Sequence, residues 1–121
     1  MLHDYAIAGV KKALPSARVG GPEVAGGPAN GNLSAFLEHA LHGRNYATGE
    51  IGTPLDFVSF HAKGAPIWIN TTGDDGYIQM NVSTQLQQID QAFGVVASYP
   101  RLRQKPIIMS CLLYTSPSPR D

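Results

Sequence analysis

His61 and Lys63 are the first candidates for a chemical role, because they follow a short apolar stretch that ends at a glycine. Leu55–Phe60 is rich in aromatic and β-branched residues, which predicts a buried strand. Gly64 comes directly afterwards and allows the chain to turn sharply. In α/β barrels and open α/β sheets, ligands bind just beyond the carboxyl ends of the strands. The sequence therefore predicts a ligand site at His61 and Lys63.

Other polar residues give weaker signals. His39 and His42 have a spacing that suits a metal pair on a helix, but no third ligand lies nearby, so two surface histidines are the favoured interpretation. Gly20 and Gly21 lack the spacing of a nucleotide-binding motif, and a structural role at the end of a strand is favoured over phosphate binding. Glu23 follows that turn and could reach the site, although a solvated loop carboxylate is favoured.

The composition limits the classes of function. The chain has 121 residues, enough for one modest domain. Nine basic and nine acidic residues give a net charge of zero, which argues against nucleic-acid binding. The one cysteine, Cys111, excludes an internal disulfide and a four-thiolate metal site. No apolar run approaches the roughly 20 residues that span a bilayer, so no membrane association is expected. Localisation stays open.

The chain alternates between expected helices and strands. Apolar residues at helical spacing predict three helices, over His3–Leu14, Leu33–Leu41 and Val82–Val96. Three strands are expected: a short one that starts at Ala17 and runs into a Gly-Gly-Pro turn at Pro22, and two apolar runs over Leu55–Phe60 and Ile107–Met109. The segment Ala65–Tyr77 is expected to be a loop. This order favours parallel strands with helical crossovers, and three strands are too few to close an eight-stranded barrel. We therefore expect an α/β chain that is part of a larger fold.

The C-terminal segment differs in character from the rest. Residues 111–121, Cys111 to Asp121, continue neither the preceding strand nor a helix. They resemble the translated adapter read-through that recurs at the ends of assembled environmental sequences. We expect residues 111–121 to be a non-native tail and residues 1–110 to carry the fold.

Four segments together resemble the catalytic domain of glycoside hydrolase family 39, which holds β-xylosidases and α-L-iduronidases. They are Ala13–Pro22, Asn45–Gly49, Leu55–Gly64 and Lys105–Ser110. They occur in family order and span nearly all of the chain before the tail. The resemblance implies strands five to seven of a (β/α)8 TIM barrel, with the intervening helices.

The resemblance also implies a retaining mechanism that uses two glutamates. The acid/base Glu is expected upstream of Met1, and the nucleophile Glu at the position of Cys111. Retaining hydrolysis needs two carboxyl groups, and a thiol is not an equivalent nucleophile in this chemistry. We therefore expect the chain as written to be inactive. No cofactor is implied, because this chemistry uses carboxylates alone.

The family pattern gives roles to the two candidate site residues. It implies that His61 hydrogen-bonds sugar hydroxyls, the alternative being a histidine satisfied within the barrel rim. The iduronidases carry Lys at the position of Lys63, within a His-x-Lys-Gly pattern, and an ammonium there could pair with the carboxylate of a uronic acid. Bacterial sequences labelled xylosidase share this pattern. The expected partner is therefore a xyloside or a uronide.

Three hypotheses follow. The first is a fragment of a retaining exo-glycosidase, xylan 1,4-β-xylosidase-like, with an α-L-iduronidase-like enzyme as its alternative. The second is a non-catalytic carbohydrate-binding domain that uses His61 and Lys63. The third is an autonomous small α/β domain of unrelated function. The first hypothesis is preferred.

Overall fold

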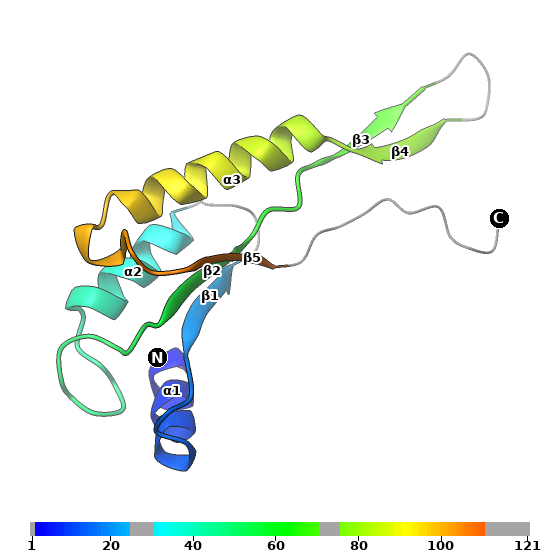
Figure 1. Ribbon diagram of the computed structural model, residues 1–121. Helices are drawn as coiled ribbons and strands as arrows, with labels where there is room; N and C mark the ends of the chain where they lie inside the picture. The colour runs from blue at the N-terminus through cyan, green and yellow to red at the C-terminus, as the bar shows by residue number, and fades with distance from the viewer. Residues whose placement is uncertain (1, 25–30, 71–75, 111–121) are drawn as a thin grey trace.

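The computed structural model describes residues 2–24, 31–70 and 76–110 (Figure 1). The elements in chain order are α1 (Leu2–Ala13), β1 (Gly20–Val24), α2 (Asn32–His42), β2 (Phe57–His61), β3 (Pro66–Ile69), β4 (Tyr77–Met80), α3 (Val82–Ala97), the short 3-10 helix η2 (Pro100–Leu102) and β5 (Ile107–Ser110). The three expected helices and the alternation of helices with three strands are confirmed. The first strand begins at Gly20, later than the expected Ala17, so the expected Gly-Gly-Pro turn is wrong and these three residues belong to β1.

The three expected strands form one parallel sheet in the order β1-β2-β5. β2 lies in the centre, with Val58 opposite Ile107 and His61 opposite Ser110 on β5. The strand order in the sheet is the same as the order along the chain, so each crossover moves the chain one strand further in a single direction. The carboxyl ends of all three strands therefore lie at one edge of the sheet.

The two faces of the sheet have different surroundings. Val58, Phe60 and Ala62 alternate along the central strand and are buried in one core. Their partners in this core come from α2, α3 and η2: Leu33, Leu37, Ala92, Val96 and Leu102. On β5, Ile107 and Met109 pack against the same core, whereas Ile108 is 43% exposed. Because side chains alternate along a strand, Ser59 and His61 belong to the face opposite these helices.

The expectation of a loop over Ala65–Tyr77 is wrong at both ends of this segment, where the structure has strands. Pro66–Ile69 and Tyr77–Met80 pair as an antiparallel ladder that extends away from the sheet (Figure 1). These strands lacked a recognisable pattern because the side chains of both are largely exposed, for example Trp68 at 62% and Ile78 at 60%. Backbone pairing holds them without an alternation of buried and exposed residues. Residues 71–75 of the expected loop lie outside the described residues.

Within the described part of the chain, no helix has both the length and the apolar character needed to cross a membrane.

Candidate ligand site at the carboxyl ends of the strands

His61 is the last residue of β2, and its ring contacts a carboxylate from the neighbouring strand. Its Nε2 lies 2.9 Å from Oε2 of Glu23 on β1. The hydroxyl of Ser110, the last residue of β5, donates a hydrogen bond to the same carboxylate oxygen. The parallel pairing therefore brings together one polar side chain from each of the three strands. The expected placement of His61 at a strand end is confirmed.

Glu23 reaches His61 because of an irregularity in β1. The register between β1 and β2 shifts between Pro22 and Val24, and Glu23 has the left-handed φ of 56°. Such a bulge redirects a side chain, and non-glycine residues adopt this conformation only when their surroundings hold them there. The expected loop position of Glu23 is therefore wrong, because Glu23 lies in β1, whereas its side chain remains partly exposed to solvent as expected. Its contact with a histidine on the next strand carries no local sequence signal.

The two groups differ in how open they are to solvent. The Glu23 side chain is 42% exposed and the His61 side chain 21%. Nδ1 of His61 is buried and has no hydrogen-bond partner among the described residues. Burial by itself would raise the pKa of Glu23, but hydrogen bonding, above all by Ser110, and the charge of His61 lower that pKa below its ordinary value. Glu23 is thus an ionised carboxylate at neutral pH.

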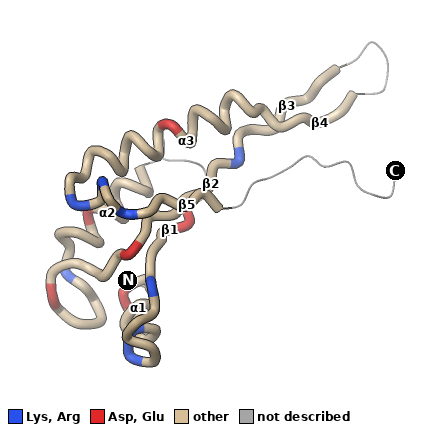
Figure 2. The backbone as a smooth tube through the Cα atoms, in the orientation of Figure 1, with Lys and Arg blue, Asp and Glu red and all other residues tan. Residues whose placement is uncertain are grey.

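Lys63 lies in the connection between β2 and β3, which carries a basic position just beyond the end of β2 (Figure 2). Ala62 is buried in the core, and Lys63 follows it outside the strand, which ends at His61. The Lys63 side chain is half-buried, and it forms no ion pair with any residue that the structure describes.

The start of α3 holds the chain where it leaves β2. The Gly64 N–H donates a 3.0 Å hydrogen bond to Oε1 of Gln88, and the Gln85 side chain donates a 2.9 Å bond to the Ala62 carbonyl. Gly64 has a φ of +73°, and a Cβ there would lie 2.7 Å from the Asn81 carbonyl oxygen. The glycine of the His-x-Lys-Gly pattern is therefore required by both its φ and this close contact.

The glycines of the first strand have a structural explanation too. A Cβ on Gly20 would lie 2.4 Å from the carbonyl oxygen of Phe57 on the adjacent strand. The absence of a side chain therefore allows β1 and β2 to approach each other. This contact supports the structural interpretation of the glycine pair.

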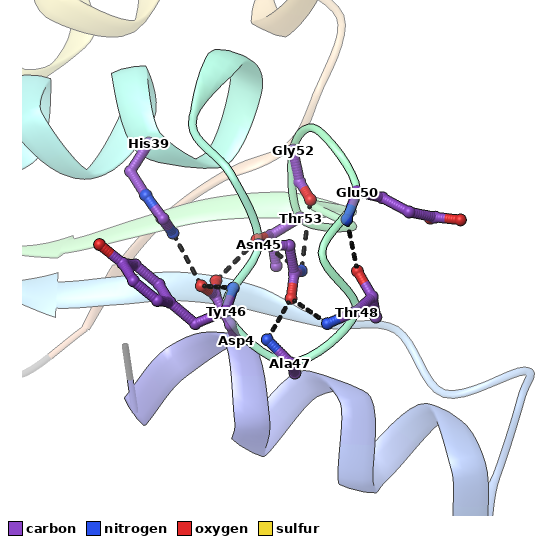
Figure 3. A network of polar contacts seen from close by, with 9 residues as sticks. All are labelled: Asp4, His39, Asn45, Tyr46, Ala47, Thr48, Glu50, Gly52 and Thr53. Carbon is purple, nitrogen blue, oxygen red and sulfur yellow. Dashed lines mark hydrogen bonds and ion pairs between the residues drawn. The ribbon is translucent and has the colours of Figure 1, made fainter.

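A second polar cluster centres on Asp4 and joins α1 to α2 and to the connection before β2 (Figure 3). Asp4 is fully buried. Its carboxylate accepts hydrogen bonds from the Thr53 hydroxyl at 2.7 Å and from the Tyr46 N–H at 3.0 Å, and it lies 2.8 Å from Nε2 of His39. Because the chain enters β2 from this connection, the cluster lies at the amino end of that strand. Its role is to fix the packing of the elements.

Asn45 explains why the segment 45–49 is a recognisable motif. Its side chain donates to the Gly52 carbonyl and to the Thr53 hydroxyl, and its Oδ1 accepts from the N–H groups of Ala47 and Thr48. One buried asparagine thus satisfies four backbone or side-chain groups of a single loop. This motif is structural.

The histidine pair on α2 divides between two environments. His39 contacts the buried Asp4 and stacks on Tyr46, so its expected position on the surface is wrong. His42 is exposed and contacts Glu38 one turn earlier, as a surface histidine does. No group of three potential metal ligands occurs among residues 2–24, 31–70 and 76–110.

A hollow of about 450 Å³ lies away from the His61 site. Its lining includes Leu55, which precedes β2, and Lys105, which precedes β5. It therefore opens at the amino ends of the strands, where parallel α/β folds do not place their ligands. Cys111 and the segment after it lie outside the described residues.

Comparisons with known proteins show which sequences this chain is similar to. No protein-family model matches the chain. It is 34% identical over 100 residues to the α-L-iduronidase of the dog, Canis lupus familiaris, and to that of Homo sapiens, which covers 81% of the chain. It is 30% identical over 107 residues to the enzyme of Mus musculus. The chain spans 14% of the dog and human proteins and 15% of the mouse protein.

The fold is also similar to a solved structure. A crystal structure described as the bacterial orthologue of human α-L-iduronidase matches with a TM-score of 0.61 and 23% identity. The match covers 87% of this chain and 16% of that one.

The chain therefore resembles glycoside hydrolases, and the expected resemblance to family 39 is confirmed. More particularly, the relatives named above are α-L-iduronidases. They support the iduronidase-like alternative better than the xylosidase-like interpretation that the sequence analysis preferred.

Proposed function

We propose that the chain is a segment of the catalytic (β/α)8 barrel of a retaining exo-glycosidase that acts on α-L-iduronides. The observation that carries the proposal is the 34% identity to α-L-iduronidases over 100 residues. A match that covers 81% of the chain is long enough to include His61 and Lys63 in its centre. The β-xyloside is the second candidate substrate.

The sheet supports the barrel assignment. Its strand order follows the chain order, and α2 and α3 pack on one face. A barrel has these two features, whereas an open doubly wound sheet reverses its strand order and carries helices on both faces. Among the described residues, β1 and β5 each pair only with β2, so both outer edges are available for further strands. In this proposal they receive the barrel strands on either side.

Exposed apolar side chains support the same assignment. On α1, Val10 is 46% and Leu14 56% exposed, and on α3, Leu86 is 60% and Phe93 47% exposed. Large apolar patches on a protein surface usually mark a contact with another element or partner. In the proposed barrel, neighbouring helices cover these side chains.

The proposed mechanism needs two carboxyl groups about 5–5.5 Å apart, one to protonate the leaving oxygen and one to attack the anomeric carbon. The nucleophile is assigned to the position that Cys111 occupies, directly after β5, and the acid/base to a residue upstream of Met1. Residues 111–121 are proposed to be a non-native tail. The 121-residue chain by itself is therefore expected to be inactive.

The site supports a uronide over a neutral sugar. Lys63 is a half-buried residue with no ion-pair partner among the described residues. A uronic acid offers a carboxylate to such a residue, whereas a xyloside offers only hydroxyls. Lys63 is accordingly assigned to the carboxylate and His61 to the same glycone subsite.

One experiment tests the proposal. The source nucleic acid is read across both ends of this frame, and the complete protein is assayed with an aryl α-L-iduronide and an aryl β-D-xyloside. We expect a Glu directly after Ser110, an Asn-Glu pair upstream of Met1, and a higher kcat/KM for the iduronide. A higher kcat/KM for the xyloside would replace the substrate with the second candidate. A complete frame without either Glu would refute the hydrolase and leave a carbohydrate-binding domain.

A further inference from the structure

We propose that Glu23 is a ligand-binding residue of the same site. Its carboxylate accepts hydrogen bonds from sugar hydroxyls, while His61 and Ser110 are positioning residues that hold it in place. This inference rests on the proposed function and deepens it by naming the group that contacts the sugar.

The His61 ring has little capacity left for a ligand. Its Nε2 is occupied by Glu23 at 2.9 Å, and its Nδ1 is buried. An ionised carboxylate can only accept hydrogen bonds, so Nε2 must carry the proton in this contact. A sugar hydroxyl could reach Nε2 only by displacing Glu23. The ring therefore acts on the ligand through the carboxylate that it holds.

Glu23 has the opposite properties. Its side chain is 42% exposed, twice the fraction of His61, although Oε2 already receives contacts from two strands. The bulge in β1 directs this side chain across the carboxyl ends of β2 and β5. A carboxylate held in this way is a preorganised acceptor, and hydrogen bonds to a charged acceptor are about twice as strong as neutral ones. Sugar hydroxyls are suitable donors for it.

The charges at this end of the sheet give the ligand an orientation. Lys63, in the connection after β2, is a cation without an ion-pair partner among the described residues, and Glu23 is an anion on β1, the strand next to β2. A uronic acid would place its carboxylate toward Lys63, because Glu23 repels that group. Its hydroxyls would then face Glu23. The two side chains thus recognise different parts of one sugar.

The first test uses the 121-residue chain and L-iduronate, with binding followed by two-dimensional amide NMR. Glu23→Gln preserves the shape of the side chain and removes its charge. Glu50→Gln is the matched control, because Glu50 lies in the connection before β2, away from the site. We expect Glu23→Gln to raise the Kd about tenfold or more, as the loss of a charge-assisted hydrogen bond predicts, and Glu50→Gln to leave it unchanged.

The same samples test the positioning role. Long-range proton–nitrogen correlations of the His61 ring report which nitrogen carries the proton. We expect Nε2–H in the unsubstituted chain and altered ring nitrogen shifts in Glu23→Gln, with no change in Glu50→Gln. Unaltered ring shifts in Glu23→Gln would overturn the contact between the two side chains.

The outcomes separate this inference from the proposed function. If iduronate binds and Glu23→Gln binds it equally well or more tightly, Glu23 is not a sugar contact and the inference fails alone. If the unsubstituted chain binds no sugar, and the complete protein hydrolyses neither glycoside, the proposed function fails. In the complete protein, Glu23→Gln is expected to raise KM about tenfold. An unchanged KM there overturns the inference even if the isolated chain does not fold.

Discussion

The carboxylate of Asp4, in the first turn of α1, accepts a 2.7 Å hydrogen bond from the hydroxyl of Thr53, which lies 49 residues later in the chain. Asp4 is fully buried, and it also contacts the Tyr46 N–H and the His39 ring. The contacts reach α1, α2 and the connection before β2. A single carboxylate therefore links three parts of the chain at the end of the sheet opposite the candidate site.

Replacement of Asp4 should be strongly destabilising. Asp4→Ala leaves the Thr53 hydroxyl and the Tyr46 N–H without their acceptor. We expect the free energy of unfolding to fall by about 1–3 kcal/mol for each buried donor that is left unpaired. Urea denaturation measures the change. Asp90→Ala, on the exposed side of α3, is the control and should change stability by less than about 0.5 kcal/mol.

Asp4 should also make stability depend on pH in the acid range. Burial by itself would raise the pKa of Asp4, but hydrogen bonds from Tyr46, Thr53 and His39 lower it well below the ordinary value of 3.8. Because the folded-state pKa is the lower one, this contribution is complete above the ordinary pKa and is lost as the pH falls below it. Stability measured between pH 6 and about pH 2.5 should fall less steeply in Asp4→Ala than in the unsubstituted chain. Parallel curves would contradict this assignment.

Gly64→Ala should disturb the end of β2. The new Cβ would lie 2.7 Å from the Asn81 carbonyl oxygen, in a residue whose φ is +73°. We expect a loss of about 1–3 kcal/mol in the free energy of unfolding. Gly94→Ala in α3 is a matched control, because a Cβ there meets nothing within 4 Å, and it should stabilise the helix by up to about 1 kcal/mol. Equal effects of the two substitutions would refute the close contact.

Lys63→Gln should distinguish the two candidate substrates. If the ammonium pairs with a uronate carboxylate, its loss in the complete protein should lower kcat/KM for the iduronide about tenfold or more and affect the xyloside less. Lys12→Gln on α1 is the control for a change of charge away from the site. Equal losses on both substrates would argue against carboxylate recognition.

His61 and Glu23 should behave as a coupled pair. His61→Ala in the complete protein is expected to weaken hydrolysis of a small aryl glycoside, because it removes the ring that holds the Glu23 carboxylate at 2.9 Å. The chain is expected to stay folded. The double substitution with Glu23→Gln should cost less than the sum of the two single ones, since each removes the same contact. Strict additivity would show that the two side chains act independently.

The helices could be predicted because their signal is local. In α2, Leu33 and Leu37 stand at helical spacing, and both are fully buried in the structure. The strand before His61 was predictable for a related reason. A short run of apolar residues between polar segments is typical of a strand that is buried in the core. The hairpin was not predictable, because exposed strands such as Pro66–Ile69 and Tyr77–Met80 have no buried face to leave a pattern.

The site was predictable only in part. His61 and Lys63 could be placed from their position after a strand and before a glycine. Glu23 could not, because its partners His61 and Ser110 lie on two other strands, and Ser110 is 87 residues away in the chain. No periodicity within β1 indicates the bulge that directs this side chain. For the same reason the contact between His39 and the buried Asp4 was missed.

The sequence by itself determined the order of the elements, the central strand and the family resemblance, because hydrophobic periodicity and short motifs depend on residues a few positions apart. The tertiary structure decided which polar side chains contact one another. Parallel pairing brings Glu23, His61 and Ser110 to one edge of the sheet, and the bulge in β1 brings the carboxylate to the ring. Those contacts depend on strand register and on desolvation, which are properties of the packed chain and not of any one segment.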